Sequence, residues 1–358
     1  MSRFVQLHIL TAYPPSNPNR DDLGRPKTAM IGNAMRQRIS SQAIKRAIRT
    51  SDVFATALKG AIGERTQRLG EEIEAYLAAK DVDEARRVDI SRHVASAFGK
   101  LKGDKDDNPT RIEQLAFISP EEKAFALELA DRLVAGEDLP KEKELGKIAL
   151  RRADGAADIA MFGRMLADNP DFNREAAVQV SHAFTTNRSA SESDYYTAVD
   201  DLKRPSEDAG AGFIGEAGFG AGVFYLYVCV DRALLIENLA GDRALAARAI
   251  EALVRATALA SPIGKRNSFA NHVRAEFVLA ERGDGQPRSL ASAFTVPVED
   301  EDLLTQSRHK LLQQRARFGA VYGQDWDADR VLDVHAEGTA TLDEVAHFSA
   351  ESLPAAVQ

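Results

Sequence analysis

Positively charged side chains, whose ligands in solution are phosphates and other anions, gather at the start of this 358-residue chain. Residues 1–51 hold nine lysines and arginines against two acidic residues, Asp21 and Asp22. Because the whole chain carries a net charge of −8, this segment is +7 and the remainder is −15. A basic stretch on an acidic body favours a confined polyanion-binding surface and argues against indiscriminate nucleic-acid binding. Counter-charges elsewhere in the fold would make it an ordinary solvated face instead.

Part of this charge has a predictable geometry. The segment 38–51, RISSQAIKRAIRTS, reads as a short helix with Ser40 or Ser41 as its N-cap. At 100° per residue, Ile44 and Ile48 lie on one face, which predicts packing against a core. The opposite face carries long amide and cationic side chains: Gln42, Lys45, Arg46 and Arg49.

Other residue types that could do chemistry give weak signals. Asp21 and Asp22 are the only carboxylates we consider for metal-assisted work on a phosphate, although a turn or an ion pair with neighbouring arginines explains them better. The seven histidines are scattered without the spacing of a metal site. Cys229 lies within an apolar run, which favours a core residue over a nucleophile. We therefore predict no catalytic residue, no metal and no cofactor.

The string GAGFIG at 210–215 matches the dinucleotide fingerprint G-x-G-x-x-G. That motif works only between a strand and a helix, whose free N–H groups hold the pyrophosphate. Here a polar stretch precedes it, and more glycine and a β-prone run, 222–230, follow it. The sequence therefore argues against a nicotinamide- or nucleotide-dependent enzyme.

The composition is that of a soluble globular protein, with 44% hydrophobic and 28% charged residues. We find no run of about 18 apolar residues, so no membrane span is expected. The single cysteine excludes an internal disulfide, and we expect a cytoplasmic protein.

Predicted strands and helices alternate along the chain, and these elements must position the residues named above. A first strand is predicted at 3–11, followed by a polar connection over 12–39. An Ala-, Glu- and Lys-rich region follows, with helices expected near 55–80, 82–100, 120–136 and 140–152. Further strands are predicted at 156–165, 177–187, 222–230 and 273–281, with helices at 242–260 and 301–318. This order predicts a ferredoxin-like α+β core with two large insertions.

Several strings then become specific in combination. They are NRDD (19–22), RISSQAIKRAIR (38–49), DIAMFGRM (158–165), HAFTTN (182–187), DYYTAVDDL (194–202) and GKRNS (264–268). In this order, they resemble the CasC-type backbone subunit of the type I-E CRISPR Cascade surveillance complex. The resemblance runs from residue 3 to about residue 295 and is weak over the helical insertion and the C-terminal tail.

The resemblance implies a hand-shaped subunit with an RNA-recognition-type (RRM-like) palm. The palm would comprise 1–51, 156–190 and 222–358, the latter including the C-terminal region. A helical fingers insertion would span 52–155, and a long thumb hairpin would span 191–221. Several copies would stack along a guide RNA in a ribonucleoprotein complex with other Cascade subunits, displaying the guide for pairing with target DNA in antiviral defence.

The same resemblance implies which residues would touch the RNA. Contacts to phosphate and sugar would come from Arg20, Lys27, Ser40, Gln42, Lys45, Arg46 and Arg49. A wedge that interrupts base stacking would come from Met165, Tyr195, Tyr196 and Thr197. The family is not known as a nuclease. Related type III subunits cut RNA with an aspartate in the loop after the first strand, which keeps a metal-dependent ribonuclease using Asp21 or Asp22 as the alternative.

Overall fold

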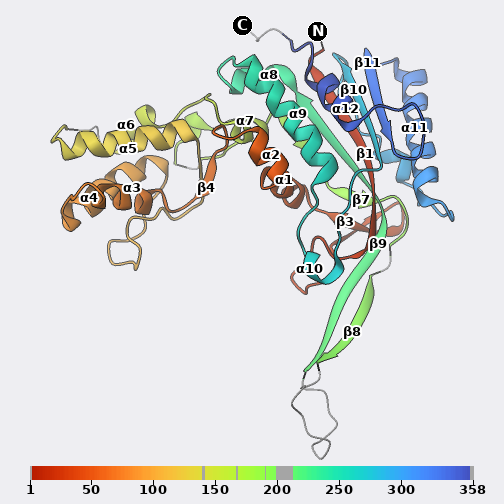
Figure 1. The fold of residues 1–358 in the computed structure, drawn as a ribbon, viewed down its shortest axis with the longest axis horizontal. Coiled ribbons are helices and arrows are strands. Elements are labelled where there is room, and N and C mark those ends of the chain that lie inside the picture. Colours follow the sequence, from red (N-terminus) through yellow and green to blue (C-terminus); the bar gives the residue numbers. More distant parts are fainter. Residues whose placement is uncertain (1, 139–141, 167, 190, 199–212, 355–358) are drawn as a thin grey trace, which may run out of the picture.

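The computed structural model describes residues 2–138, 142–166, 168–189, 191–198 and 213–354. Figure 1 shows a mixed α+β palm, a helical lobe on its left and a β-hairpin that extends downward from the palm. We call these three regions the palm, the fingers and the thumb. None of the described helices is long and apolar enough to cross a membrane.

An antiparallel sheet forms the palm. Its central strand β1 (Phe4–Ser16) lies between β9 (Phe213–Asp231) and β10 (Phe277–Gly283). Beyond β9 lie the short strands β6 (Val178–Val180) and β7 (Ala183–Thr185). The crossing helices are α1 (Ser41–Arg49) and α9 (Arg243–Leu259). The order β10-β1-β9-β6/β7 is that of a ferredoxin-like βαββαβ unit, which confirms the predicted fold class.

Both faces of this sheet are covered. Val5, Leu7 and Ile9 alternate along β1 toward a core shared with α1, α9 and two further helices, α2 (Asp52–Ala57) and α12 (Leu342–Ala350). The opposite face packs on α11 (Leu303–Tyr322) and the 3₁₀ turn η3 (Ala291–Phe294). Helix α8 (Arg232–Asn238) follows β9, and β11 (Ala328–Asp333) extends the sheet beside β10.

The polar connection predicted over 12–39 is largely wrong, because β-structure occupies much of it. Strand β1 continues to Ser16, and β2 (Thr28–Ile31) pairs with β3 (Ala34–Ile39). Gly32 and Asn33 join them with φ of 56° and 57°, as a two-residue type I′ turn requires. The irregular connection is therefore only residues 17–27.

Two strand predictions also need correction. Residues 156–165 contain helix α7 (Ala157–Phe162), which ends at Gly163 with φ of 79°. Ala157 and Met161 bury their small and flexible side chains against the palm, so packing, and not β-propensity, decides this segment. Residues 177–187 divide into β6 and β7.

The fingers have a core of their own and contain both helices and a small sheet. Their helices are α3 (Leu69–Ala78), α4 (Glu84–Ala95), α5 (Pro120–Val134) and α6 (Glu142–Ala149), with 3₁₀ turns η1 (Ser96–Phe98) and η2 (Pro170–Phe172). A two-stranded sheet, β4 (Glu64–Thr66) and β5 (Ala116–Ile118), interrupts the helix expected at 55–80. Phe54 and Leu58 belong to the palm core, so the palm continues past residue 51.

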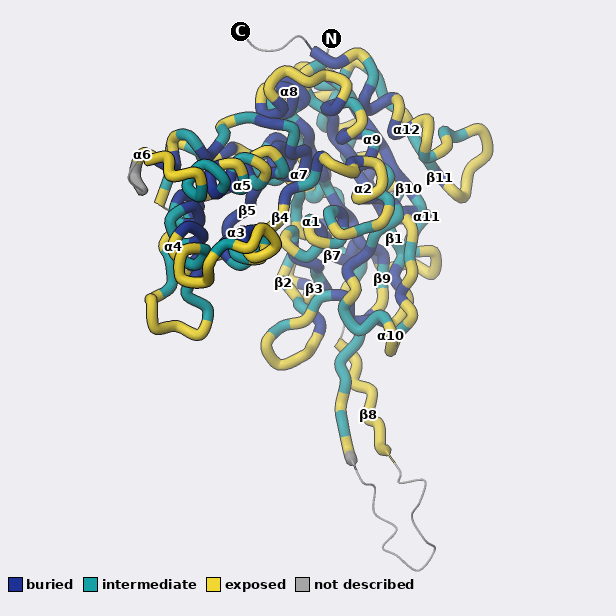
Figure 2. The backbone as a smooth tube through the Cα atoms, turned by 60° about the vertical axis from the view of Figure 1, so that its left-hand side comes forward, coloured by how far each residue is buried: buried dark blue, intermediate teal, exposed yellow. Residues whose placement is uncertain are grey.

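The thumb is a hairpin of β8 (Glu192–Ala198) and the first part of β9. Every residue of β8 is exposed, and Figure 2 shows this strand in yellow beside the mostly intermediate, teal part of β9. Half of GAGFIG, at 210–212, and part of the thumb, at 199–212, lie outside the described residues. Because β9 begins at Phe213 and runs unbroken into the palm, the glycines are followed by a strand, as predicted.

Candidate nucleic-acid interface

The loop 17–27 is clamped against the base of the thumb. Asn17 donates from Nδ2 to the carbonyl oxygens of Gly24, at 2.9 Å, and of Gly218 in β9, at 2.8 Å. A Cβ at Gly218 would lie 3.1 Å from Cδ of Pro26, so the contact requires a very small residue there. These contacts fix the backbone that carries Arg20.

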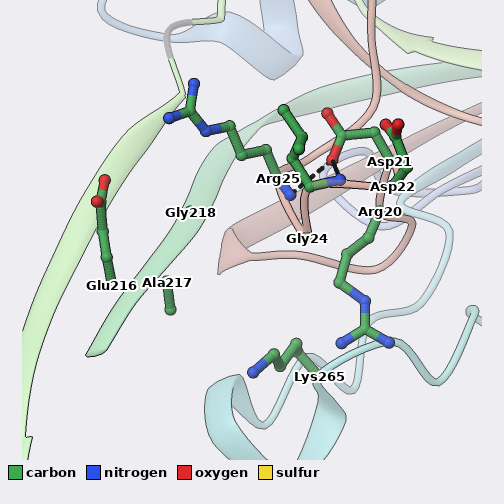
Figure 3. Close-up of a pocket in the computed structure, with 10 residues that line it drawn as sticks. Arg20, Asp21, Asp22, Gly24, Arg25, Glu216, Ala217, Gly218 and Lys265 are labelled. Carbon is green, nitrogen blue, oxygen red and sulfur yellow. Dashed lines mark hydrogen bonds between the residues drawn. The ribbon is translucent and has the colours of Figure 1, made fainter. Parts of the chain in front are cut away.

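A pocket of about 640 Å³ opens between this loop, the thumb base and the short helix α10 (Arg266–Phe269). Figure 3 shows the Arg20 guanidinium and the Lys265 side chain at its lower edge, while the Arg25 guanidinium lies at the upper left. Gly264 packs so closely on the loop that a Cβ there would lie 2.3 Å from the Pro18 carbonyl oxygen. The structure thus places Lys265 beside Arg20.

Our sequence reasoning did not identify Lys265 as a binding residue. The segment GKRNS (264–268) drew attention only through a family resemblance, because two adjacent cations are a common surface feature. The docking of residues 264–269 against the loop and the thumb is a tertiary contact. Phe269, for example, lies 5.9 Å from Phe219 of β9, measured between ring centroids.

Helix α1 follows the predicted amphipathic pattern. Ile44 and Ile48 are buried, whereas Gln42 and Arg46 are exposed. Ser40 is the N-cap, and its Oγ accepts the Ala43 N–H at 3.3 Å. Since Ser40 is only 7% exposed, its structural task is to start the helix that presents the other side chains.

Lys45 and Arg49 lean from α1 toward the fingers. The Lys45 ammonium lies 5.9 Å from the centroid of Phe162, and burial lowers the pKa of this lysine. The Arg49 guanidinium lies 4.9 Å from the centroid of Phe117 in β5 and 3.4 Å from the carboxylate of Asp158. The cationic side chains predicted for the outer face of α1 therefore extend from the palm to the fingers. Only 19% of the Arg49 side chain is exposed.

Two further cations, Arg38 and Lys27, lie near His182 at the N-terminus of α1. His182 accepts the Ser41 N–H through Nδ1 at 3.3 Å, and the same nitrogen is 3.4 Å from the Arg38 guanidinium. Desolvation and the charges of Arg38 and Lys27 lower the pKa of His182. Two donors facing Nδ1 favour the neutral ring with its proton on Nε2. The string HAFTTN gave His182 no role in the sequence analysis.

The thumb tyrosines point to opposite faces of the hairpin. Tyr195 is opposite Glu216, which lines the Arg20 pocket, and Tyr196 is opposite Gly215. Neighbouring residues of a strand alternate in direction, so Tyr195 and Tyr196 lie on opposite faces of the hairpin. They are 65% and 43% exposed, and Thr197 is exposed on the Tyr195 face. The predicted wedge therefore divides between two faces.

Met165 also presents an apolar group to solvent. It follows α7 and is 82% exposed, although its neighbour Arg164 is buried. The structure places Met165 at the palm–fingers boundary, beyond the helix that carries Phe162.

Not every cation in residues 1–51 reaches the surface. Arg36 is fully buried and donates to the carbonyl oxygens of Thr185, at 3.0 Å, and of Phe294, at 2.9 Å. Arg3 pairs with Asp231 at 2.6 Å. The charge of +7 therefore overstates what the surface displays, because strand pairing fixes burial and a charge sum contains no such information.

Asp21 shapes the backbone of its loop. One carboxylate oxygen accepts the N–H groups of Leu23, at 3.0 Å, and of Arg25, at 2.9 Å. Within the described ranges, no cluster of three or more histidine, cysteine, aspartate or glutamate side chains could hold a metal ion. The turn explanation of Asp21 is thus supported by its hydrogen bonds.

Comparison with known proteins assigns the family. A family model described as CT1975-like protein matches residues 5–358. This chain belongs to the CT1975-like family. No curated protein sequence matches the CT1975-like chain.

Solved structures extend the family assignment. One chain, from a structure titled "CRISPR RNA-guided surveillance complex, pre-nicking", has a TM-score of 0.82 and 29% identity, with 95% of the CT1975-like chain and 94% of that chain covered. Another, titled "CRISPR RNA-guided surveillance complex", has a TM-score of 0.70 and 27% identity, covering 96% and 94%. The resemblance to surveillance-complex backbone subunits is confirmed, while the type I-E assignment stays a prediction.

Proposed function

We propose that this CT1975-like protein is a non-catalytic, guide-RNA-binding backbone subunit of a type I-E CRISPR surveillance complex. Several copies would polymerise along the RNA beside other Cascade subunits in the cytoplasm. The bound guide would be displayed for pairing with target DNA in antiviral defence. The titles of the two solved structures support the proposal, since both name an RNA-guided surveillance complex.

The observation that carries the proposal is the course of exposed and half-buried cationic and amide side chains. They begin at the thumb base, continue over the outer face of α1 and reach the palm–fingers boundary, in the order Arg20 with Lys265, Gln42 with Arg46, and Lys45 with Arg49. Cationic and amide groups bind phosphate and sugar without reading bases. A subunit that accepts guides of any sequence needs this kind of contact.

The thumb supports the stacking of copies. Its strand β8 is exposed along its whole length, so this strand buries little surface against its own palm. A projecting hairpin with tyrosines on both faces suits insertion between nucleotides and neighbouring subunits, where flat rings replace interrupted base stacking.

Charge reversal on the cation course tests the proposal. The double variant Arg20→Glu with Arg46→Glu should lose guide RNA, because it replaces two attractive phosphate contacts with repulsive ones. We would purify the protein with its expressed guide and measure the 260 nm absorbance and the length of the bound RNA. The wild type should carry RNA of uniform length, and the variant should carry little.

Arg248→Glu provides the matched control. Arg248 is an exposed arginine of α9 outside the proposed contact set, so its reversal should leave the bound RNA unchanged. Equal RNA in all three proteins, at equal thermal stability, would reject the proposed surface.

A metal-dependent ribonuclease is the second candidate. In its favour, Asp21 and Asp22 line the same pocket as Arg20. Incubation of the assembled complex with complementary RNA and Mg²⁺ distinguishes the two functions. A backbone subunit leaves the RNA intact, whereas regular cuts that disappear in Asp21→Ala or Asp22→Ala would establish the nuclease.

A further inference from the structure

The palm and the fingers are joined at a buried carboxylate. Where the chain leaves the palm, the Ala61 carbonyl accepts the N–H of Ala157 at 2.8 Å. Two residues later, the N–H of Gly63 donates to Oδ1 of Asp158 at 2.7 Å, and the same oxygen accepts the Ile159 N–H at 3.0 Å. Asp158, in α7, is fully buried and therefore holds the outgoing and the returning segments together.

Two other buried acids near this joint have close, fully buried partners. Glu122 pairs with Arg164 at 2.6 Å, and Asp154 pairs with Arg174 at 2.7 Å. All four side chains are at most 1% exposed. Burial acts to raise the pKa of Asp154, but the hydrogen bond and charge of Arg174 outweigh it and the pKa is lowered. Pairs of this kind are structural, since neither partner can reach a ligand.

Asp158 differs from them. Its arginine, Arg49, lies at 3.4 Å and comes from the helix that carries the proposed RNA contacts. Arg49 lines a pocket of about 430 Å³ at the start of the fingers, and 19% of its side chain is exposed. Burial raises the pKa of Asp158 to about 6, against the lowering effects of the Gly63 N–H and of Arg49. This carboxylate is therefore only weakly stabilised in its charged form.

The other described charged side chains near Asp158 have different partners and do not pair with this carboxylate in place of Arg49. Lys45 lies over the ring of Phe162, at the end of α7, and Arg65 of β4 lies 5.2 Å from the centroid of Phe117. Two carboxylates, Glu64 and Glu72, also line the pocket beside Arg49. Both pair with Lys123, at 2.8 Å and 2.5 Å. Arg49 alone is within ion-pair distance of Asp158 among the described residues.

We propose that Asp158 is a positioning residue that shares Arg49 with bound RNA. The Asp158 carboxylate holds the Arg49 guanidinium over the Phe117 ring, beside the pocket that Arg49 lines, until a phosphate in that pocket binds the guanidinium. The phosphate then competes for the positive charge and adds a negative neighbour. Both changes favour transfer of a proton from solvent to Asp158, so RNA binding at this joint takes up a proton. This inference rests on the proposed RNA-binding function.

The expected consequence is an affinity for guide RNA that depends on Asp158 and pH. Each unit by which binding raises a pKa changes affinity about tenfold over the titration range. For a rise of one unit in the pKa of Asp158 from about 6, the wild type should therefore gain about fivefold more affinity between pH 8 and pH 6 than Asp158→Asn. At pH 8 the variant should bind RNA more tightly than the wild type, because its amide cannot repel a phosphate and still accepts the Gly63 N–H.

Thermal melting separates positioning from folding. The Asp158→Asn chain should melt no lower than the wild type at pH 8, since it no longer buries a poorly compensated charge. Asp154→Asn is the matched control, because its partner Arg174 is buried. That control should melt lower and keep the wild-type pH dependence of RNA binding.

The outcomes distinguish this inference from the proposed function. If Arg46→Glu binds guide RNA as well as the wild type, the proposed function fails. If Arg46→Glu loses RNA while Asp158→Asn keeps the wild-type pH dependence, only the role of Asp158 fails.

A second measurement covers the case in which Asp158→Asn does not fold. Calorimetry of RNA binding in two buffers of different ionisation enthalpy detects proton uptake in a chain that retains Asp158. Using His182→Asn as the background removes the histidine at the N-terminus of α1 as a source of proton uptake. Different binding enthalpies in the two buffers support proton uptake, and equal enthalpies contradict it.

Discussion

At the scale of single residues, the interface depends on side chains that the fold brings together from distant segments. Lys265 and Arg20 are the clearest pair, since both line the pocket at the thumb base. If both contact phosphates, each contributes to the salt dependence of RNA affinity through the counterions that its contact releases.

We expect Lys265→Ala to reduce the slope of log affinity against log salt concentration by about 0.7, the value for one contact to a single strand. Arg20→Ala should have the same effect. Titrations of guide RNA at several salt concentrations measure the slope, and Arg248→Ala, on α9, should leave it unchanged. An unaltered slope in Lys265→Ala would remove this residue from the interface.

The Ser40 hydroxyl has a structural task that competes with its proposed contact to RNA. Replacement of an N-cap serine by alanine costs about 1 kcal/mol of stability. Ser40→Ala should therefore lower the free energy of unfolding by about that amount. Ser40→Asn, which caps equally well, should restore both stability and RNA binding. Urea unfolding and RNA titration test this, and lost RNA affinity in a stable Ser40→Asn would show a direct hydroxyl contact.

At the scale of elements, the thumb hairpin combines exposure with one tight internal contact. A Cβ at Gly215 would lie 2.4 Å from Cζ of Tyr196, so any larger residue displaces this ring from the strand. Gly215→Val should therefore disturb the Tyr196 face and leave the Tyr195 face in place. Its melting temperature should stay within a few degrees of the wild type, because the hairpin lies outside the palm core.

Nuclease footprinting of bound guide RNA provides the measurement for this variant. We expect Gly215→Val to weaken the periodic protection that regularly spaced thumbs produce. Tyr196→Ala should resemble it, and a normal footprint for both would assign the wedge to Tyr195 alone.

At the scale of the whole molecule, a buried network secures the sheet face that packs on α11. Glu281 of β10 contacts His8 at 3.2 Å, Arg288 at 2.9 Å and Arg315 at 2.7 Å. Burial acts to raise the pKa of Glu281, but hydrogen bonds and charges from His8 and Arg288 bring it to about 2. Because the pKa of Glu281 is lower in the folded protein than its unfolded value of about 4.5, the ionised carboxylate stabilises the fold above pH 4.5. This contribution to stability disappears as the pH falls toward 2.

We expect Glu281→Gln to lower the free energy of unfolding by about 3 kcal/mol at pH 7, because it leaves buried arginines without their counter-charge. Urea unfolding at pH 7 measures the loss. Glu276→Gln removes an acid from an exposed pair with His335 and should change stability by less than about 1 kcal/mol. Similar losses in the two variants would contradict the importance of the buried network.

The sequence by itself determined the elements whose signals are local. The N-cap and periodicity of 38–51 predicted α1 and its buried face, and the β-prone run at 222–230 predicted β9 through the palm. The ordered strings also predicted the family. Caps, periodicity and strand propensity act between residues a few positions apart, so they can be recognised without knowing the fold.

The tertiary structure alone decided which charges face solvent and which are paired. Arg36 contacts residues of β7 and η3, and Arg49 meets Asp158 across the fingers insertion. Lys265 reaches the Arg20 pocket through the docking of α10. These outcomes depend on strand register and long-range packing, because a side chain's burial and its counter-charge come from segments far away in the chain.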